Sequence, residues 1–160
     1  MYACAPSNII YNIVKNYIFA DFQNITTNNI VECDLTESAK NGEAKEKLRE
    51  VFGGEDLKFD VIIGNPPYQE MDGGAQASAS PIYHHFVRLA KELEPGLISF
   101  IMPTRWYAGG KGLDDFRDEM LNDIHIRELH DWLTPEDIFP HTNIRGGVCY
   151  FLWDKDYDNN

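Results

Sequence analysis

The sequence predicts an α/β fold with a largely parallel sheet and an antiparallel pair of strands at one edge. Apolar runs of strand length alternate with stretches of helical periodicity, which favours parallel strands joined by right-handed crossovers. The last two apolar runs, Ile126–Trp132 and residues 148–153, have no helix of normal length between them, which favours antiparallel pairing. The length of 160 residues suits one ordinary domain.

The first part of the chain predicts two helices separated by a short strand. Apolar residues recur at helical spacing within residues 1–23. A short strand is expected at residues 30–33, directly before Asp34. Residues 38–52 are rich in Lys, Glu and Ala and precede Gly53, which predicts a surface helix with a glycine stop.

The sequence after residue 58 predicts further strands, whose ends could carry a ligand site. Residues 59–64 and 97–102 are short apolar runs and are expected to be buried strands. Asn65, Pro103 and Asp34 each directly follow a predicted strand, and ligands of open α/β sheets bind beyond the carboxyl ends of strands. The other expected elements are a mobile loop at 73–80, a helix at 82–93, a glycine-rich connection at 109–112 and a helix with Leu113, Phe116, Met120 and Leu121 inward.

Composition and charge exclude several classes of protein. Hydrophobic residues make up 43% and charged residues 25%, as in a soluble globular chain. No apolar run approaches the roughly 18 residues of a membrane span, and no basic leader opens the chain. Cys4, Cys33 and Cys149 are widely spaced, which favours a reducing cytoplasm over a disulfide framework or a zinc ribbon. The net charge of −12 repels duplex DNA.

The tetrapeptide Asn65-Pro66-Pro67-Tyr68 resembles the catalytic motif of amino-group methyltransferases that use S-adenosylmethionine. An exocyclic amine of adenine is a weak nucleophile, because its lone pair is delocalised into the ring. The Asn65 side-chain oxygen and the Pro66 carbonyl are candidate acceptors for its two N–H groups, held in place because proline fixes φ. Tyr68 offers an aromatic face to the base and to its transient positive charge.

The structural alternative for this tetrapeptide is a rigid turn or a proline-rich ligand segment. The motif directly follows an apolar strand in an α/β pattern, which is the context that the chemistry requires. The position therefore favours the catalytic interpretation.

The resemblance continues through residues 81–103 and 137–153 and covers roughly residues 59–155. It is strongest to N6-adenine DNA methyltransferases of type II restriction–modification systems, including those with a fused nuclease. The resemblance implies a partial Rossmann-like methyltransferase sheet and S-adenosylmethionine as the cofactor. It also implies site-specific methylation of the N6 amine of an adenine flipped out of the duplex.

Two features that the family leads one to expect are missing from the sequence. Its glycine-containing cofactor motif has no counterpart, and no acidic residue occurs in positions 1–20 to hold the cofactor ribose. Asp34 resembles the acidic position that contacts the cofactor's adenine, and a helix cap with Glu37 as capping-box partner is an equal alternative. We therefore expect residues 1–160 to be a partial catalytic domain without a target-recognition domain, inactive alone, cytoplasmic, and bound to DNA through the parent protein.

Other functional interpretations stay open at this point. Protein glutamine methyltransferases and some ribosomal RNA methyltransferases carry the same motif, whereas N4-cytosine enzymes more often begin it with serine. A catalytically inactive interaction or specificity fragment fits the missing cofactor motif and the charge. No metal is expected, since His84 and His85 are adjacent on a predicted helix and have no further ligands near them in sequence.

The absence of a glycine-bearing first strand has a consequence for assembly. Residues 59–64 would then present an unpaired apolar edge. We expect this edge to be covered by a second copy of the chain, giving a homo-oligomer, or by residues 1–23.

Overall fold

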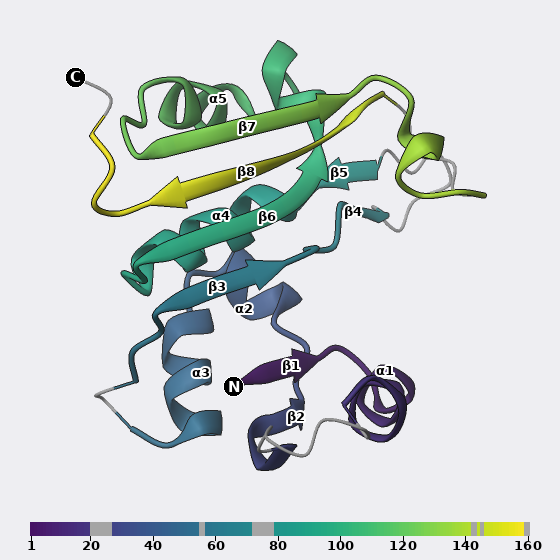
Figure 1. Ribbon diagram of the computed structural model, residues 1–160, viewed down its shortest axis with the longest axis vertical. Helices are drawn as coiled ribbons and strands as arrows, with labels where there is room; N and C mark the ends of the chain where they lie inside the picture. Colours follow the sequence, from purple (N-terminus) through teal and green to yellow (C-terminus); the bar gives the residue numbers. More distant parts are fainter. Residues whose placement is uncertain (20–26, 55–56, 72–78, 142–143, 145, 159–160) are drawn as a thin grey trace. The chain divides into compact units, whose positions relative to one another are not determined.

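The computed structural model describes residues 1–19, 27–54, 57–71, 79–141, 144 and 146–158. The chain divides into two compact units, Met1–Leu57 and Lys58–Asn160 (Figure 1). None of the helices in these ranges combines the length and the apolar character that crossing a bilayer requires.

The unit Met1–Leu57 is built on two three-residue strands that pair in parallel, with Ala3 opposite Ile30. Its elements are β1 (Ala3–Ala5), α1 (Asn8–Ile13), a π-helical segment (Val14–Ile18), a 3-10 turn (Thr27–Asn29), β2 (Ile30–Glu32), α2 (Thr36–Lys40) and α3 (Ala44–Phe52).

The predicted elements of this unit are present with different bounds. The helix expected within residues 1–23 begins only at Asn8, because the residues before it form β1. Ser7 is its N-cap and accepts a hydrogen bond from the Ile10 N–H at 3.4 Å. The helix expected at 38–52 is two helices, and the second ends at Gly53, whose φ of 83° suits glycine.

The unit Lys58–Asn160 contains a four-stranded sheet with the order β3-β6-β8-β7 and a separate hairpin of β4 and β5. Its helices and strands are β3 (Val61–Gly64), β4 (Gln69–Met71), β5 (Ala79–Pro81), α4 (Tyr83–Glu92), β6 (Leu97–Pro103), a 3-10 helix (Thr104–Ala108), α5 (Asp114–Leu121), β7 (Ile126–Trp132), a 3-10 turn (Pro135–Asp137) and β8 (Val148–Asp154).

The pairing within this sheet is mixed. β3 runs parallel to β6, with Gly64 opposite Phe100, whereas β8 is antiparallel to both β6 and β7. The predicted antiparallel pair at one edge is therefore confirmed. The expectation of a largely parallel sheet is wrong for these strands, because the chain returns from β7 as an antiparallel strand that inserts beside β6.

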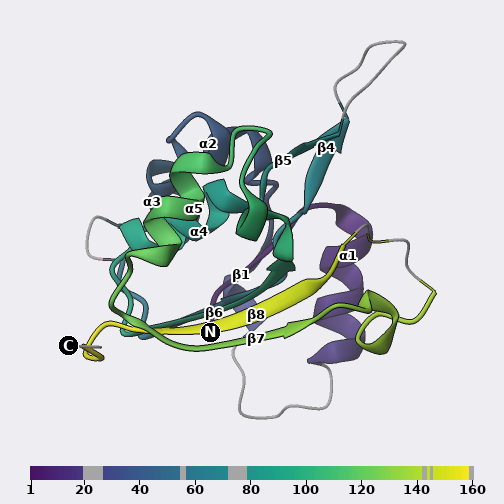
Figure 2. The ribbon, with the colours of Figure 1, turned by 90° about the horizontal axis from the view of Figure 1, so that it is seen from above.

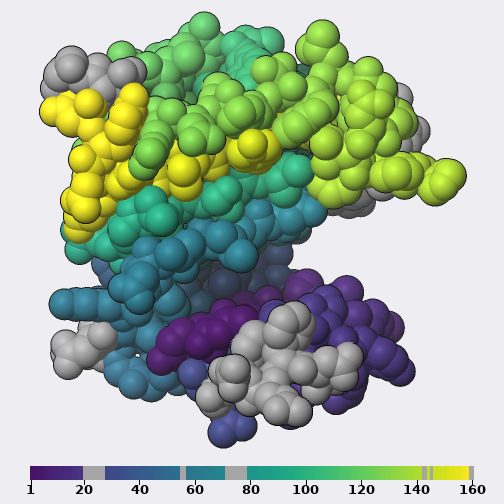
Figure 3. Space-filling view, viewed as in Figure 1, coloured from purple at the N-terminus to yellow at the C-terminus, as the bar shows by residue number. Residues whose placement is uncertain are grey.

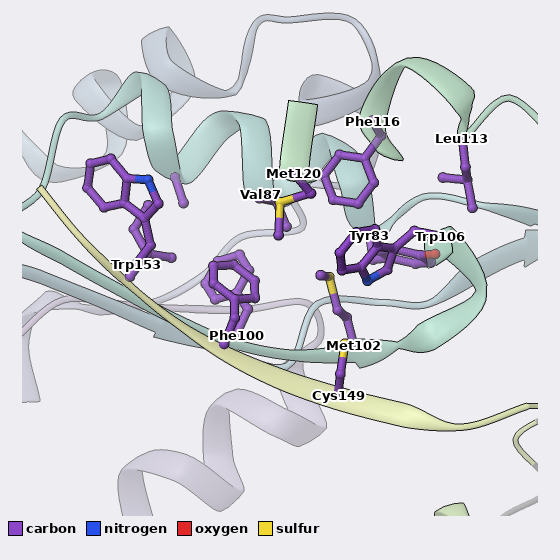
Figure 4. Packing of buried hydrophobic residues seen from close by; sticks show 13 residues of the cluster. Tyr83, Val87, Phe100, Met102, Trp106, Leu113, Phe116, Met120, Cys149 and Trp153 are labelled. Atoms are coloured by element: carbon purple, nitrogen blue, oxygen red, sulfur yellow. The ribbon is translucent and has the colours of Figure 1, made fainter. Parts of the chain in front are cut away.

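The core of this unit lies on one face of the sheet, where α4 and α5 cover β6 and β8 (Figure 2). Alternate residues of the two strands, such as Ile98 and Phe151, point into this core. From α5 come Phe116 and Met120, as predicted, whereas Leu121 is exposed, against the prediction. Figure 4 shows the packing around Phe100, Val87 and Phe116.

Among the described residues of this unit, no helix packs on the other face of the sheet, since α4 and α5 both lie on the first face. Figure 3 shows this other face, with side chains of β6, β8 and β7 at the surface. Val61 and Ile63 are exposed, Ile63 to 76%, so the predicted burial of both faces of this strand is wrong. Of the mobile loop predicted at 73–80, residues 73–78 lie outside the described residues, and Ala79 and Ser80 belong to β5.

Candidate active site

The four motif residues directly follow β3 at its carboxyl end. A side chain on Gly64 would lie 3.2 Å from the Phe100 ring, so glycine permits the close approach of β3 and β6. Beyond this contact Asn65 and Pro67 are exposed, Pro66 is buried and Tyr68 is half-buried. The arrangement leaves the Asn65 amide accessible while the prolines fix the backbone around it.

Tyr68 is held through its backbone, and the end of its side chain is buried. Its carbonyl oxygen accepts a hydrogen bond from the Ile82 N–H at 3.2 Å, at the point where β4 and β5 form a hairpin. Its phenol oxygen is buried, and burial, followed by the neighbouring Cys149, raises the pKa of Tyr68 to about 12. The phenol is therefore neutral at physiological pH.

The carboxyl end of β6 lies at the same edge of the sheet, since β3 and β6 are parallel neighbours. The chain turns there from Pro103 into the 3-10 helix, and the Thr104 N–H donates to the Gly147 carbonyl at 2.9 Å. A side chain on Gly147 would lie 2.5 Å from the Trp132 carbonyl oxygen, so this contact requires glycine. The prediction that Asn65 and Pro103 lie at carboxyl ends of strands is confirmed, and Asp34 follows β2 in the other unit.

Asp34 belongs to the unit Met1–Leu57 and follows β2 by two residues. Its Oδ1 accepts a hydrogen bond from the Thr36 N–H at 2.9 Å, and this contact holds the pKa of the exposed carboxyl below its usual range. Glu37 pairs with Lys40 at 3.0 Å instead of completing a capping box. The N-cap of α2 is Leu35 and has no side-chain cap, so the interpretation of Asp34 as a helix cap is wrong. The Asp34 contact with Thr36 is a local turn, and the carboxylate remains an exposed, ionised acceptor.

The fit of these residues to S-adenosylmethionine is partial. An exposed carboxylate at Asp34 suits the amino group of the cofactor's adenine, which donates hydrogen bonds. The carboxyl end of β1 is followed by Pro6 and Ser7, and the Ser7 hydroxyl already accepts from the first turn of α1. The described part of residues 1–20 therefore offers no acidic partner for a ribose.

The two histidines on α4 do not form part of a metal site within the described residues. Their rings lie 4.0 Å apart, and His84 packs beside Phe116. Burial, followed by the nearby His85 and Arg88, lowers the pKa of His84 to about 4. The His84 ring is therefore neutral at physiological pH.

Two comparisons with known proteins bear on this site. Residues 1–139 match the family described as Eco57I restriction-modification methylase. The chain belongs to this family. Over 104 residues it is also 38% identical to an "Uncharacterized adenine-specific methylase" of Mycoplasma pneumoniae (strain ATCC 29342 / M129 / Subtype 1). The match covers 63% of this chain and 25% of that protein, so the chain spans about a quarter of the relative's length.

Sequence reasoning missed part of this Eco57I-family site. Trp106, in the 3-10 helix after β6, is 1% exposed and belongs to the core. Sequence reasoning gave no role to Cys149, which is fully buried and contributes to the raised pKa of Tyr68. The alternation of Cys149, Phe151 and Trp153 along an apolar strand was a signal that all three face the same core.

Proposed function

We propose that this chain is the catalytic part of an adenine-specific DNA methyltransferase of a restriction–modification system. In this proposal it transfers a methyl group from S-adenosylmethionine to the N6 amine of an adenine that is flipped out of the duplex. The observation that carries the proposal is the position of Asn65-Pro66-Pro67-Tyr68, with an exposed Asn65 at the carboxyl end of β3. Membership of the Eco57I family and the printed name of the relative support it.

The motif residues have separate roles in this reaction. The Asn65 side-chain oxygen and the Pro66 carbonyl accept hydrogen bonds from the two N–H groups of the target amine. These contacts strengthen as the nitrogen becomes pyramidal and positively charged, so they favour the transition state over the planar ground state. Tyr68 stacks on the base and stabilises the developing charge through its ring. When bound, S-adenosylmethionine supplies the electrophilic methyl group.

The sheet supports a Rossmann-like assignment within this proposal. β3 and β6 are parallel neighbours joined through α4, and their carboxyl ends carry the motif and Pro103. Open α/β sheets bind ligands at this edge. Asp34 would hold the adenine of the cofactor, and other segments would hold its ribose.

DNA is the proposed substrate, although the chain itself carries a net charge of −12. Phosphate contacts supply most of the affinity for duplex, and they require cationic side chains. We therefore expect affinity and target recognition to come from other segments of a longer protein. Because DNA is the proposed substrate, we also propose that the protein is located in the cytoplasm.

Methyl transfer by the full gene product tests the proposal directly. The protein is incubated with tritiated S-adenosylmethionine and unmethylated DNA, and the nucleosides are separated to identify the methylated base. We expect N6-methyladenine from the wild type and a rate lower by about 10²–10³ for Asn65→Ala, the usual loss for one preorganised transition-state contact. Asn122→Ala, an exposed asparagine after α5, is the matched control and should keep the wild-type rate.

Different products would contradict the proposal. Methylation of ribosomal RNA or of a protein glutamine, with none on DNA, would assign the motif to another substrate class. A wild-type rate for Asn65→Ala on adenine would remove the role given to Asn65. No transfer to any substrate by a folded, full-length protein would favour an inactive interaction fragment.

A further inference from the structure

Residues 104–112 leave the carboxyl end of β6 and lead into α5, and we call them the 104–112 segment. Two buried side chains anchor this segment in the core: Trp106 within it is 1% exposed, and Leu113 directly after it is fully buried (Figure 4). The Arg117 Nε of α5 donates a hydrogen bond to the Tyr107 carbonyl at 2.8 Å. The path of the segment is therefore fixed by its neighbours.

Four consecutive residues of the segment have a positive φ. The angle is 69° at Gly109, 75° at Gly110, 51° at Lys111 and 78° at Gly112. Glycine adopts such angles without strain, whereas a residue with a Cβ, such as Lys111, does so at a cost. The Gly110 N–H donates to Asp114 Oδ1 at 2.9 Å, which holds this turn in place. Backbone strain that the surroundings impose in this way is concentrated at functional sites.

Lys111 connects the segment with the hairpin that follows the motif. Its Nζ donates a hydrogen bond to the Ala79 carbonyl of β5 at 3.3 Å. β5 pairs with β4, which begins directly after Tyr68, and the Tyr68 carbonyl accepts from the Ile82 N–H at 3.2 Å. The exposed Lys111 side chain therefore carries its positive charge to the hairpin beside the motif.

Arg105 is the exposed cation in the first turn of the segment. It follows β6 by two residues, and the carboxyl end of β6 lies at the edge of the motif because β3 and β6 are parallel, with Gly64 opposite Phe100. Arg105 forms no ion pair with any residue that the structure describes, although the chain has 26 acidic residues. Four other arginines each contact a carboxylate: Arg49, Arg88, Arg117 and Arg127. The Arg105 guanidinium is therefore available to an anion from outside the chain.

We propose that Arg105 and Lys111 bind phosphates of the DNA strand on either side of the target adenine. This inference rests on the proposed function. A flipped adenine stays covalently attached to its strand, so the flanking phosphates come to the sheet edge at which Asn65 meets the amine. Guanidinium and ammonium groups are the usual protein ligands of phosphate, and such contacts fix the register of the strand without reading its sequence.

The two contacts complement the affinity that other segments of a longer protein supply. A chain with a net charge of −12 repels duplex as a whole, so the approach of the strand to the motif needs local cations. Arg105 and Lys111 provide them from one anchored segment, which limits the side-chain and backbone freedom lost on binding.

Three variants and a control separate phosphate binding from stability. Arg105→Gln removes one charge, Arg105→Lys retains it, and Lys111→Gly removes the ammonium with a residue that adopts the positive φ without strain. Lys155→Gln is the matched control, because Lys155 is also exposed but lies at the opposite edge of the sheet, where its N–H donates to the carbonyl of Gly96, the residue before β6. Each variant is prepared in the full-length gene product, and urea unfolding verifies that it is folded.

The first measurement is the salt dependence of DNA binding, followed by the fluorescence anisotropy of a labelled duplex of mixed sequence between about 50 and 200 mM sodium chloride. We expect Arg105→Gln and Lys111→Gly each to weaken binding about tenfold at low salt, and to reduce the slope of log K against log salt by about one. Arg105→Lys should retain the slope, and Lys155→Gln should retain both slope and affinity. A loss of stability alone does not change this slope.

The second measurement is the steady-state kinetics of DNA methylation. Phosphate contacts are present in the ground state and in the transition state alike, so their loss should raise KM for DNA about tenfold with little change in kcat. Lys155→Gln should leave both constants unchanged. If Arg105→Gln does not fold, Lys111→Gly and Arg105→Lys decide the question by the same two measurements.

The outcomes distinguish the two proposals. If the wild-type protein methylates no adenine while the salt slope on duplex falls in Arg105→Gln and Lys111→Gly, the proposed function fails and the phosphate contacts stand. If adenine is methylated but these two variants keep the wild-type slope and KM, the role given to Arg105 and Lys111 is wrong. A reduced slope on an RNA strand, with an unchanged slope on DNA duplex, would also contradict the assignment to DNA.

Discussion

The two units of this chain bury very different side chains. In Lys58–Asn160 three strands have seven residues each, and the core contains Trp106, Phe116 and Phe151. In Met1–Leu57 both strands have three residues, and most buried side chains are small. Hydrophobic stabilisation grows with the apolar area removed from water. The unit with the motif therefore gains more stabilisation from its own core.

The difference indicates how the proposed site divides its tasks. The motif, which needs fixed acceptors, belongs to the unit with long strands and a large aromatic core. Asp34, the candidate cofactor contact, belongs to the unit in which Ile9 and Tyr17 are exposed. The larger core of residues 58–160 suits the fixed acceptors that the proposed function requires of the motif.

The largest expected effect in this comparison comes from the core of Lys58–Asn160. Phe116 is fully buried and its ring faces Tyr83 and Trp106. We expect Phe116→Ala to lower the free energy of unfolding by about 3–5 kcal/mol. Val51→Ala, on an exposed position of α3, should change it by less than about 0.5 kcal/mol. Urea unfolding followed by tryptophan fluorescence measures both. Equal losses would contradict the assignment of stability to this core.

A second expected effect concerns the partly buried ion pair between α4 and the turn before β7. Lys91 contacts Asp123 at 2.5 Å, and the same carboxylate accepts a hydrogen bond from Trp153 Nε1 at 3.0 Å. The carboxylate also accepts from the His125 N–H at 3.0 Å. Asp123→Ala removes the acceptor for these three donors, and we expect a loss of about 1–3 kcal/mol. The matched control is Glu119→Ala, which breaks the more exposed pair with Arg88 and should cost about 0–1 kcal/mol. Similar losses for the two variants in urea unfolding would show that burial does not distinguish these pairs.

In Lys58–Asn160 the sequence predicted the positions of helices and strands better than it predicted which of their faces are buried. Helical stripes and strand-length apolar runs are local patterns, and they located α4, α5, β6 and β8 to within one or two residues. Whether a strand is covered on both faces depends on where the helices pack. This explains why the exposure of Ile63 was not predicted.

The same distinction applies to the candidate site. The motif is contiguous, so its four residues and their place after a strand follow from the sequence alone. The core beside it unites Tyr83, Trp106, Phe116 and Cys149 from four separate elements, and no local pattern shows that they meet. In Met1–Leu57, likewise, Cys4 and Cys33 are far apart in sequence yet adjacent, and burial followed by Cys33 raises the pKa of Cys4 to about 12. Both thiols are free, as the sequence predicted.

The third prediction is a pH dependence that arises from His84 in Lys58–Asn160. His84 has a pKa of about 4 when folded, below its ordinary value of 6.5, because it is buried and faces His85 and Arg88, with Glu119 opposing the shift. The unfolded state therefore binds more protons between these two values. The contribution of His84 to the free energy of unfolding should be fully present above pH 6.5. It should fall by up to about 1.4 kcal/mol per pH unit as the pH drops toward 4.

The control for this prediction is a pair of histidine variants. His84→Gln should remove the extra slope of unfolding free energy between pH 6.5 and 4, whereas His130→Gln, at an exposed position on β7, should retain it. Urea unfolding at a series of pH values measures the slope. An unchanged slope in His84→Gln would show that another group titrates.

The smallest expected effect concerns β3, a strand at one edge of the described sheet. Val61 and Ile63 are exposed on β3, which has a strand paired on one side in the described sheet. Exposed apolar edges recruit further chains, so we expect the protein to self-associate through this strand. Ile63→Lys should weaken that association by about tenfold, the equivalent of roughly 1.4 kcal/mol, with little effect on folding. Ile124→Lys, an exposed position outside β3, is the matched control and should leave association unchanged. Sedimentation equilibrium over a range of concentrations measures the constant, and a wild-type protein that stays monomeric throughout, indifferent to the charge at position 63, would refute the prediction.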